Sequence, residues 1–137
     1  MRQPDLYGTT TLPSIEENCH LHAEARGVAV DFRQTNHEGV LIDWVQKASN
    51  RTGDQKVQGL IINAAGYTHT SVALMDALLM LDIPIIDVHL TNIFSRESYR
   101  TTSLIASTAL GVIAGFGQNG YILAIDALIP HVKQKII

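Results

Sequence analysis

Short, strongly apolar runs that alternate with helical patterns constrain the fold of this chain more than any other feature. The run GLIIN is apolar on both faces, as strands of a parallel sheet require, because helices cover both faces of such a sheet, and IPIIDV is predicted to be another strand. The predicted strands cover 28–32, 59–63, 83–88 and 109–117, and the predicted helices cover 14–26, 36–49, 71–81 and 119–132. This alternation predicts an α/β protein with a doubly wound parallel sheet and helices on both faces.

The start of the first helix carries a capping-box pattern. Ser14 and Glu17 have the S-x-x-E spacing, Pro13 stands just before them, and Gly27 follows the last helical residue. The pattern predicts Ser14 as the residue that caps this helix.

A strand is missing before that helix. A sheet of the flavodoxin-like order, which we expect here, begins with a strand that lies inside the sheet. Residues 1–11 have no apolar period and are predicted to be a loop. We therefore expect a single domain over 1–137 that lacks its first strand, and we hypothesise that a longer natural chain was shortened. A native mass equal to that of this sequence would contradict the hypothesis.

The composition of the chain argues against some classes of binding partner. With 137 residues, 46% of them hydrophobic and 17% charged, the chain suits one globular domain. The net charge of −3 and the scattered basic residues argue against nucleic acid or an anionic membrane as a partner. The single cysteine, Cys19, cannot form an internal disulfide, which indicates a reducing compartment. Without a signal-peptide pattern or a bilayer-length apolar run, a cytoplasmic location is predicted.

Polar side chains follow two of the predicted strands, at the edge where open α/β sheets bind ligands. Asn63 and His69 follow one strand, and His89 follows the next. Asp87 and His89 are two apart on a strand, so both should point the same way. A carboxylate beside an imidazole suits a general acid or base. The alternatives are a turn-capping Asn63, a His69 that merely opens a helix, and a strand-end ion pair at Asp87 and His89.

Three further patterns in the sequence carry weaker functional signals. GFGQNG at 115–120 matches a dinucleotide fingerprint but lacks the following strand and acidic residue, so it predicts a tight turn and close helix–sheet packing. Arg100 could clamp a carboxylate, although a lone arginine is more often a solvated charge. His20 and His22 do not share a helix face, so no metal site is predicted.

Four segments, in order along the chain, resemble motifs of the type II 3-dehydroquinate dehydratases, or type II dehydroquinases. R-x-P-x-x-Y-G at 2–8 is similar to the family's catalytic loop, and N-A-A-G-Y-T-H-T-S at 63–71 to its N-A-G-x-x-T-H-T-S signature. D-V-H-L-T-N at 87–92 resembles E-V-H-I-S-N, with R-E-x-x-R following at 96–100. G-F-G-Q-N-G-Y at 115–121 resembles the glycine-rich stretch before the last helix.

The resemblance implies dehydration of 3-dehydroquinate to 3-dehydroshikimate by anti elimination through an enolate, without metal or cofactor. It leaves open aromatic amino acid biosynthesis and quinate catabolism. It implies Tyr7 as the base, tuned by Arg2, and His89 as the general acid, supported by Asp87. Asn63 would hold an oxygen where enolate charge develops. The positions that match the remaining substrate-binding residues are His69, Asp76, Leu90, Thr91 and Arg100.

Residues 1–11 are polar and contain glycine, so we expect them to form a mobile lid. The resemblance also implies a homo-oligomer, a dodecamer of trimers, in which Asp76 reaches a neighbouring subunit's site. The chain departs from the family pattern at several positions. Asp87 stands where glutamate is usual and reaches less far, and Thr91 replaces serine but keeps the hydroxyl. Phe94 and Thr102 stand where many members have histidine. The alternative function is a non-catalytic relative that keeps the fold as a binding or structural module.

Overall fold

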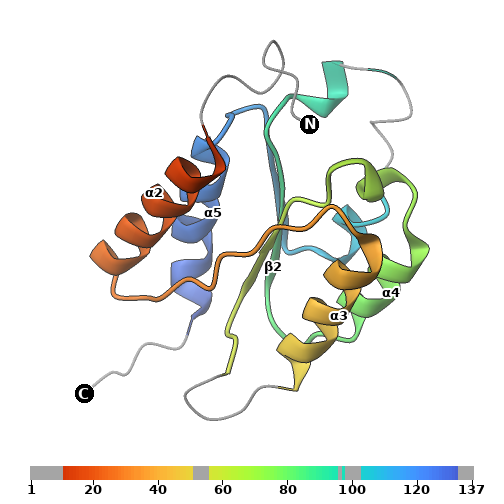
Figure 1. Cartoon of the computed structure of the whole chain (residues 1–137), viewed down its shortest axis with the longest axis horizontal. Helices are drawn as coiled ribbons and strands as arrows, with labels where there is room; N and C mark the ends of the chain where they lie inside the picture. Colours follow the sequence, from red (N-terminus) through yellow and green to blue (C-terminus); the bar gives the residue numbers. More distant parts are fainter. Residues whose placement is uncertain (1–10, 51–55, 96, 98–102, 133–137) are drawn as a thin grey trace.

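The protein is arranged in three layers, with a parallel sheet between two pairs of helices (Figure 1). A computed structural model describes residues 11–50, 56–95, 97 and 103–132. Its strands are β1 (Leu60–Ile62), β2 (Ile85–His89) and β3 (Gly111–Ala114), in the order β1-β2-β3. Its α-helices are α2 (Leu12–Ala25), α3 (Glu38–Ser49), α4 (Val72–Leu79) and α5 (Asn119–Leu128). The predicted doubly wound α/β fold, with helices on both faces, is confirmed.

Short 3₁₀ helices complete the connections at the ends of the strands. Their bounds are Ala65–His69 for η2, Ile93–Ser95 for η3, Ala106–Thr108 for η5 and Ile129–His131 for η6. In the parallel register Ile62 pairs with Asp87, and His89 pairs with Ala114. The carboxyl ends of all three strands therefore meet at one edge of the sheet, and the polar residues that follow them are brought together there.

Two apolar layers hold the helices to the sheet. Leu74 of α4 and Ile105 are fully buried in the layer shared with α3, while Val88 lies in the layer under α5. Gly120 of α5 packs closely against the sheet in that second layer, because a Cβ atom there would lie 3.2 Å from Cγ1 of Val88. This contact confirms the predicted close helix–sheet packing at the glycine-rich stretch.

The predicted strand at 28–32 is not a strand in the structure. Its side chains do alternate as those of a strand would: Val28, Val30 and Phe32 are half-buried against α2 and α5, whereas Ala29 and Asp31 are exposed. A strand also needs a hydrogen-bonded neighbour, and β1 pairs only with β2 among the residues described. The apolar alternation thus predicted the buried face correctly, but a strand also requires a partner that the side-chain pattern does not reveal.

Two helix boundaries also differ from the prediction. Thr11, not Ser14, caps α2, and its hydroxyl accepts a hydrogen bond from the Ser14 amide at 3.3 Å. Pro13 has no amide hydrogen and a φ suited to the first turn, so the helix begins before it. At the other end of the chain, α5 stops at Leu128 instead of 132 and continues as η6. Pro130 explains this, because it cannot donate to the helical ladder.

Candidate active site

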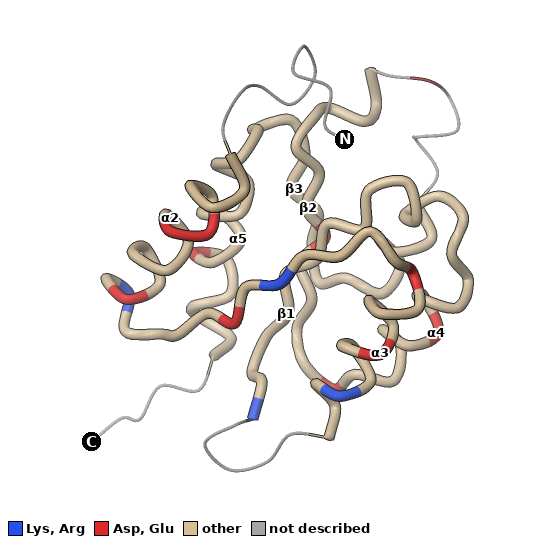
Figure 2. The backbone as a smooth tube through the Cα atoms, in the orientation of Figure 1, with Lys and Arg blue, Asp and Glu red and all other residues tan. Residues whose placement is uncertain are grey.

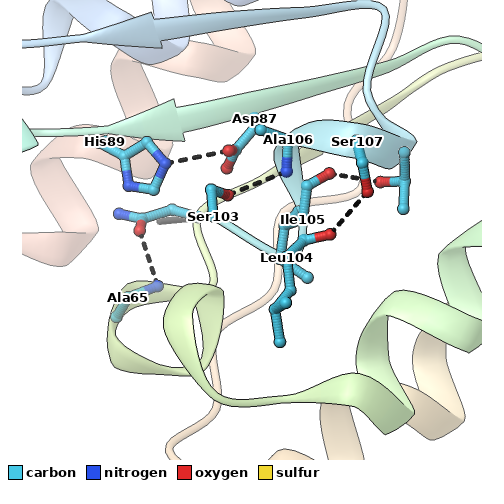
Figure 3. A network of polar contacts seen from close by, with 10 residues as sticks. Ala65, Asp87, His89, Ser103, Leu104, Ile105, Ala106 and Ser107 are labelled. Carbon is cyan, nitrogen blue, oxygen red and sulfur yellow. Dashed lines mark hydrogen bonds and ion pairs between the residues drawn. The ribbon is translucent and has the colours of Figure 1, made fainter. Parts of the chain in front are cut away.

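The strongest chemical feature of the sheet edge is a buried carboxylate–imidazole pair on β2. His89 Nε2 lies 3.0 Å from Asp87 Oδ2, and the two residues are only 4% and 0% exposed (Figure 3). Both side chains point the same way, as their spacing predicted. The shorter side chain of aspartate is sufficient at this position, so the departure from glutamate does not break the contact. With Nε2 engaged by Asp87, Nδ1 is the ring nitrogen left for a substrate.

The second oxygen of Asp87 has no hydrogen-bond partner among the residues that the structure describes. Oδ1 is fully buried, and the only other such side-chain atom among the described residues is Oγ1 of Thr68. The hydroxyl of Ser103, also drawn in Figure 3, accepts a hydrogen bond from the Ala106 amide at 2.9 Å. A buried carboxylate with one unsatisfied oxygen is costly for the fold, and such features concentrate at functional sites.

Asn63, directly after β1, is held by two hydrogen bonds. Its Oδ1 accepts from the Ala65 amide at 3.1 Å, and its Nδ2 donates to the hydroxyl of Tyr121 on α5 at 2.9 Å. The turn-capping alternative is therefore confirmed for Asn63. It does not exclude a role with substrate, because a carboxamide offers two donor hydrogens and two acceptor lone pairs. One hydrogen and one lone pair remain for a ligand.

Ala65 has a left-handed backbone conformation, with φ of 51°, and no other non-glycine residue described has a positive φ. It opens η2 and donates the amide hydrogen that orients Asn63. The family signature quoted above has glycine at this point. An L-residue pays about 1–2 kcal/mol in this region, which glycine avoids.

Replacing Ala65 with glycine is expected to stabilise the protein. Relief of backbone strain exceeds the entropy that glycine adds to the unfolded chain, which leaves a net gain of about 0.5–1 kcal/mol. Thermal unfolding would show this as a higher Tm. Ala64→Gly is the matched control, because Ala64 is buried at a φ of −81° and should lose stability. Equal losses in both variants would contradict the strain at Ala65.

The segment after β2 is fixed by the glycine-rich stretch. The Gly115 amide donates to the carbonyl of His89 at 3.2 Å, and the Gly117 amide donates to the carbonyl of Leu90 at 2.8 Å. Both glycines have positive φ, of 94° and 58°, where other L-residues are strained. The predicted tight turn is thus confirmed. It holds Leu90, which is buried, and Thr91, which is half-buried, at the sheet edge beside His89.

The remaining predicted site residues fall into two groups. His69 ends η2 at the sheet edge and is half-buried, whereas Asp76 lies exposed on α4 and is not gathered with the others. Arg2, Tyr7 and Arg100 lie outside the described residues, as do most of the predicted lid and Thr102. Phe94, another departure from the family, is exposed on η3.

The described residues were also compared with other kinds of site: a metal site, a reactive thiol, a basic surface and a membrane span. Within it, no three histidine, cysteine or acidic side chains come together as a metal site would require. Burial, with a smaller contribution from Glu16, raises the pKa of the Cys19 thiol, which keeps it protonated and unreactive at neutral pH. Figure 2 shows the Lys and Arg positions of this part scattered over separate elements. None of its helices has the length and apolar content needed to span a bilayer.

Sequence reasoning did not assign a role to Tyr121 or Ser103. Tyr121 stands at the end of a quoted motif, but its contact with Asn63 joins residues that are 58 positions apart. Ser103 follows the polar loop without any spacing that marks it. The sequence held no signal that pairs either residue with the site.

An α/β sheet with a buried acid–base pair at its ligand-binding edge is typical of an enzyme that moves protons on a small molecule. Residues 1–129 match the family described as dehydroquinase class II, so the chain belongs to that family. Its relatives are hydro-lyases by name, and the protein is an enzyme of this class.

Two curated relatives indicate how similar the sequences are. A 3-dehydroquinate dehydratase of Dinoroseobacter shibae is 52% identical over 95% of this chain and 83% of its own length. The 3-dehydroquinate dehydratase 2 of Pseudomonas aeruginosa is 50% identical over 91% of this chain and 81% of its own.

Solved structures agree with the fold. The type II dehydroquinase of Propionibacterium acnes has a TM-score of 0.86 at 35% identity, covering 94% of this chain and 86% of its own. A 3-dehydroquinate dehydratase-like protein of Bifidobacterium longum has a TM-score of 0.67 at 30% identity, covering 87% of this chain and 86% of its own.

Proposed function

We propose that the protein dehydrates 3-dehydroquinate to 3-dehydroshikimate by an anti elimination through an enolate. The observation that carries the proposal is the buried Asp87–His89 pair at the carboxyl edge of the sheet, in a chain of this family. The reaction removes a proton next to a ketone and expels a hydroxyl group, so it needs one base and one acid.

His89 is the acid in this proposal. A protonated imidazole donates its Nδ1 hydrogen to the departing hydroxyl, while Asp87 holds Nε2 and stabilises the cationic ring at 3.0 Å. Burial of the pair excludes water, which strengthens the interaction between the carboxylate and the imidazolium. Tyr7 is the base and Arg2 the cation that favours its phenolate form.

The other polar groups hold the substrate. The free hydrogen of Asn63 Nδ2 stabilises the oxygen on which enolate charge develops. The segment at Leu90 and Thr91, tied down by the two glycine amides, binds the carboxylate. His69 binds a ring hydroxyl, and Arg100 is the remaining substrate-binding residue of the proposal.

A non-catalytic structural role is the weaker alternative. A buried ion pair adds little to stability compared with apolar residues of the same size, and the unpaired oxygen of Asp87 makes this pair still more costly. A structural module gains nothing from such an arrangement, whereas a proton-transfer site does.

The assembly is proposed to be a homo-oligomer, a dodecamer of trimers. Asp76 lies on an exposed face of α4 with Val72 and Leu79, and Met80 follows directly after the helix. These three neighbours are all exposed and apolar. This face suits contact with a second copy, and Asp76 would then reach the neighbour's site. We also propose a cytoplasmic location, since the only cysteine is a buried free thiol. Membership of the dehydroquinase family supports a role in aromatic amino acid biosynthesis.

Turnover of 3-dehydroquinate tests the function. The product is a conjugated enone, so absorbance should rise when the substrate is added to the pure protein. With substrate deuterated at one or the other hydrogen next to the ketone, product mass distinguishes anti from syn elimination. A folded oligomer that produces no enone would support the structural alternative, and syn loss would contradict the anti elimination proposed here.

A further inference from the structure

We propose that Tyr121 is a positioning residue that orients the carboxamide of Asn63 toward the substrate. This inference rests on the proposed function and adds to it a residue of α5, the last α-helix described. Tyr121 acts through Asn63, and no contact of its own with substrate is required.

The two contacts of Asn63 determine the orientation of its amide group. The Ala65 amide can only donate, so the atom that faces it at 3.1 Å must be the oxygen. The nitrogen then faces the Tyr121 hydroxyl at 2.9 Å and donates one hydrogen to it. With both ends anchored, the second hydrogen of Nδ2 has a single direction, and so does the free lone pair of Oδ1.

Tyr121 is a rigid anchor because its own position is fixed twice. Its ring packs in the apolar layer under α5, together with Ile61 of β1 and with Ile125. The residue before it, Gly120, packs closely against β2, since a Cβ atom there would lie 3.2 Å from Cγ1 of Val88. The hydroxyl is therefore held in place relative to both β1 and β2, the strands that carry Asn63 and His89.

The consequence for catalysis is one of preorganisation. A hydrogen-bond donor aimed where charge develops lowers the barrier only if it does not have to reorient during the reaction. Without the Tyr121 hydroxyl, the carboxamide is held at its oxygen alone, and Nδ2 can turn away from the substrate. Tyr121 thus affects the rate through the orientation of Asn63.

A double-mutant cycle tests this coupling. Tyr121→Phe removes the hydroxyl and keeps the ring, Asn63→Ala removes its partner, and the double variant closes the cycle. The control is Tyr67→Phe, because the Tyr67 hydroxyl also makes one hydrogen bond, to the Asn36 carbonyl at 3.0 Å. All four variants are assayed with 3-dehydroquinate, with Tm measured in parallel.

Tyr121→Phe is expected to lower kcat/KM about three- to tenfold, the equivalent of one lost hydrogen bond. In the Asn63→Ala background it should have no further effect, and Tyr67→Phe should leave kcat/KM unchanged. An unchanged kcat/KM in Tyr121→Phe, or the same loss in both backgrounds, would overturn the inference.

A crystal structure of Tyr121→Phe gives a readout that does not depend on turnover. The Asn63 carboxamide is expected to lose its single orientation, whereas an unchanged carboxamide would overturn the inference. If wild-type protein forms no enone while the carboxamide does turn in the variant, then the proposed function fails and the positioning role of Tyr121 stands.

Discussion

Replacing His89 with glutamine is expected to lower kcat by about a hundredfold to ten-thousandfold, the usual contribution of a general acid. Glutamine can still donate a hydrogen bond to Asp87, so the buried carboxylate is not left alone. Alanine would be a poor choice, because removing one partner of a buried ion pair costs about 3–5 kcal/mol and could unfold the protein. The measurement is enone formation under saturating 3-dehydroquinate.

The chain offers a matched control for this substitution. His22 of α2 makes the same kind of contact, with Nε2 at 2.8 Å from Oδ1 of Asp126 on α5. His22→Gln therefore repeats the chemical change between two helices, outside the proposed site, and should leave kcat unchanged. If His89→Gln retained wild-type kcat at an unchanged Tm, then His89 would not be the acid.

Replacing Tyr7 with phenylalanine is expected to reduce kcat by about a hundredfold or more, because the ring remains but its proton-accepting oxygen is gone. Substrate should still bind, so KM should change much less than kcat. Tyr67→Phe again serves as the control. Retention of wild-type turnover in Tyr7→Phe would mean that another group removes the proton.

The proposed partner of Tyr7 can be tested through the pH profile. A phenol has a pKa near 10, and a nearby cation lowers it by about 1–3 units. Since the base works deprotonated, activity rises with pH through this pKa. Arg2→Ala removes the cation, so the rising limb of kcat should move to higher pH by a similar amount. If the rising limb of kcat stayed at the same pH, then Arg2 would not be the cation that lowers the pKa of the base.

The sequence predicted the fold class because its evidence is local and repeated. The run at β1 is apolar on both faces, and short apolar runs alternate with segments of helical period. This pattern predicts parallel strands with helices covering them. The predicted helix boundaries were wrong where a proline stands close to the end of a helical pattern. Pro13 moved the start of α2 to Leu12, and Pro130 ended α5 at Leu128.

In the sequence, the candidate active site is marked only by the residues at the strand ends and by the motifs. The two-residue spacing of Asp87 and His89 placed both on one face of a strand, and the topology brought Asn63 to the same edge. The similarity of the quoted segments to one family supplied the chemistry. Neither source revealed that Ala65 is strained or that Gly115 and Gly117 hold the carbonyls of His89 and Leu90.

The sequence by itself thus determined the layers of this protein, its family and the residue types at its candidate site. Only the tertiary structure decided which groups touch. Residues 28–32 have the side chains of a strand, yet they form none because a strand depends on a neighbour elsewhere in the chain. Tyr121 meets Asn63 across 58 positions because α5 packs over β1 and β2. Hydrogen bonds between distant residues depend on the packing of whole elements, and no local pattern of residues contains that information.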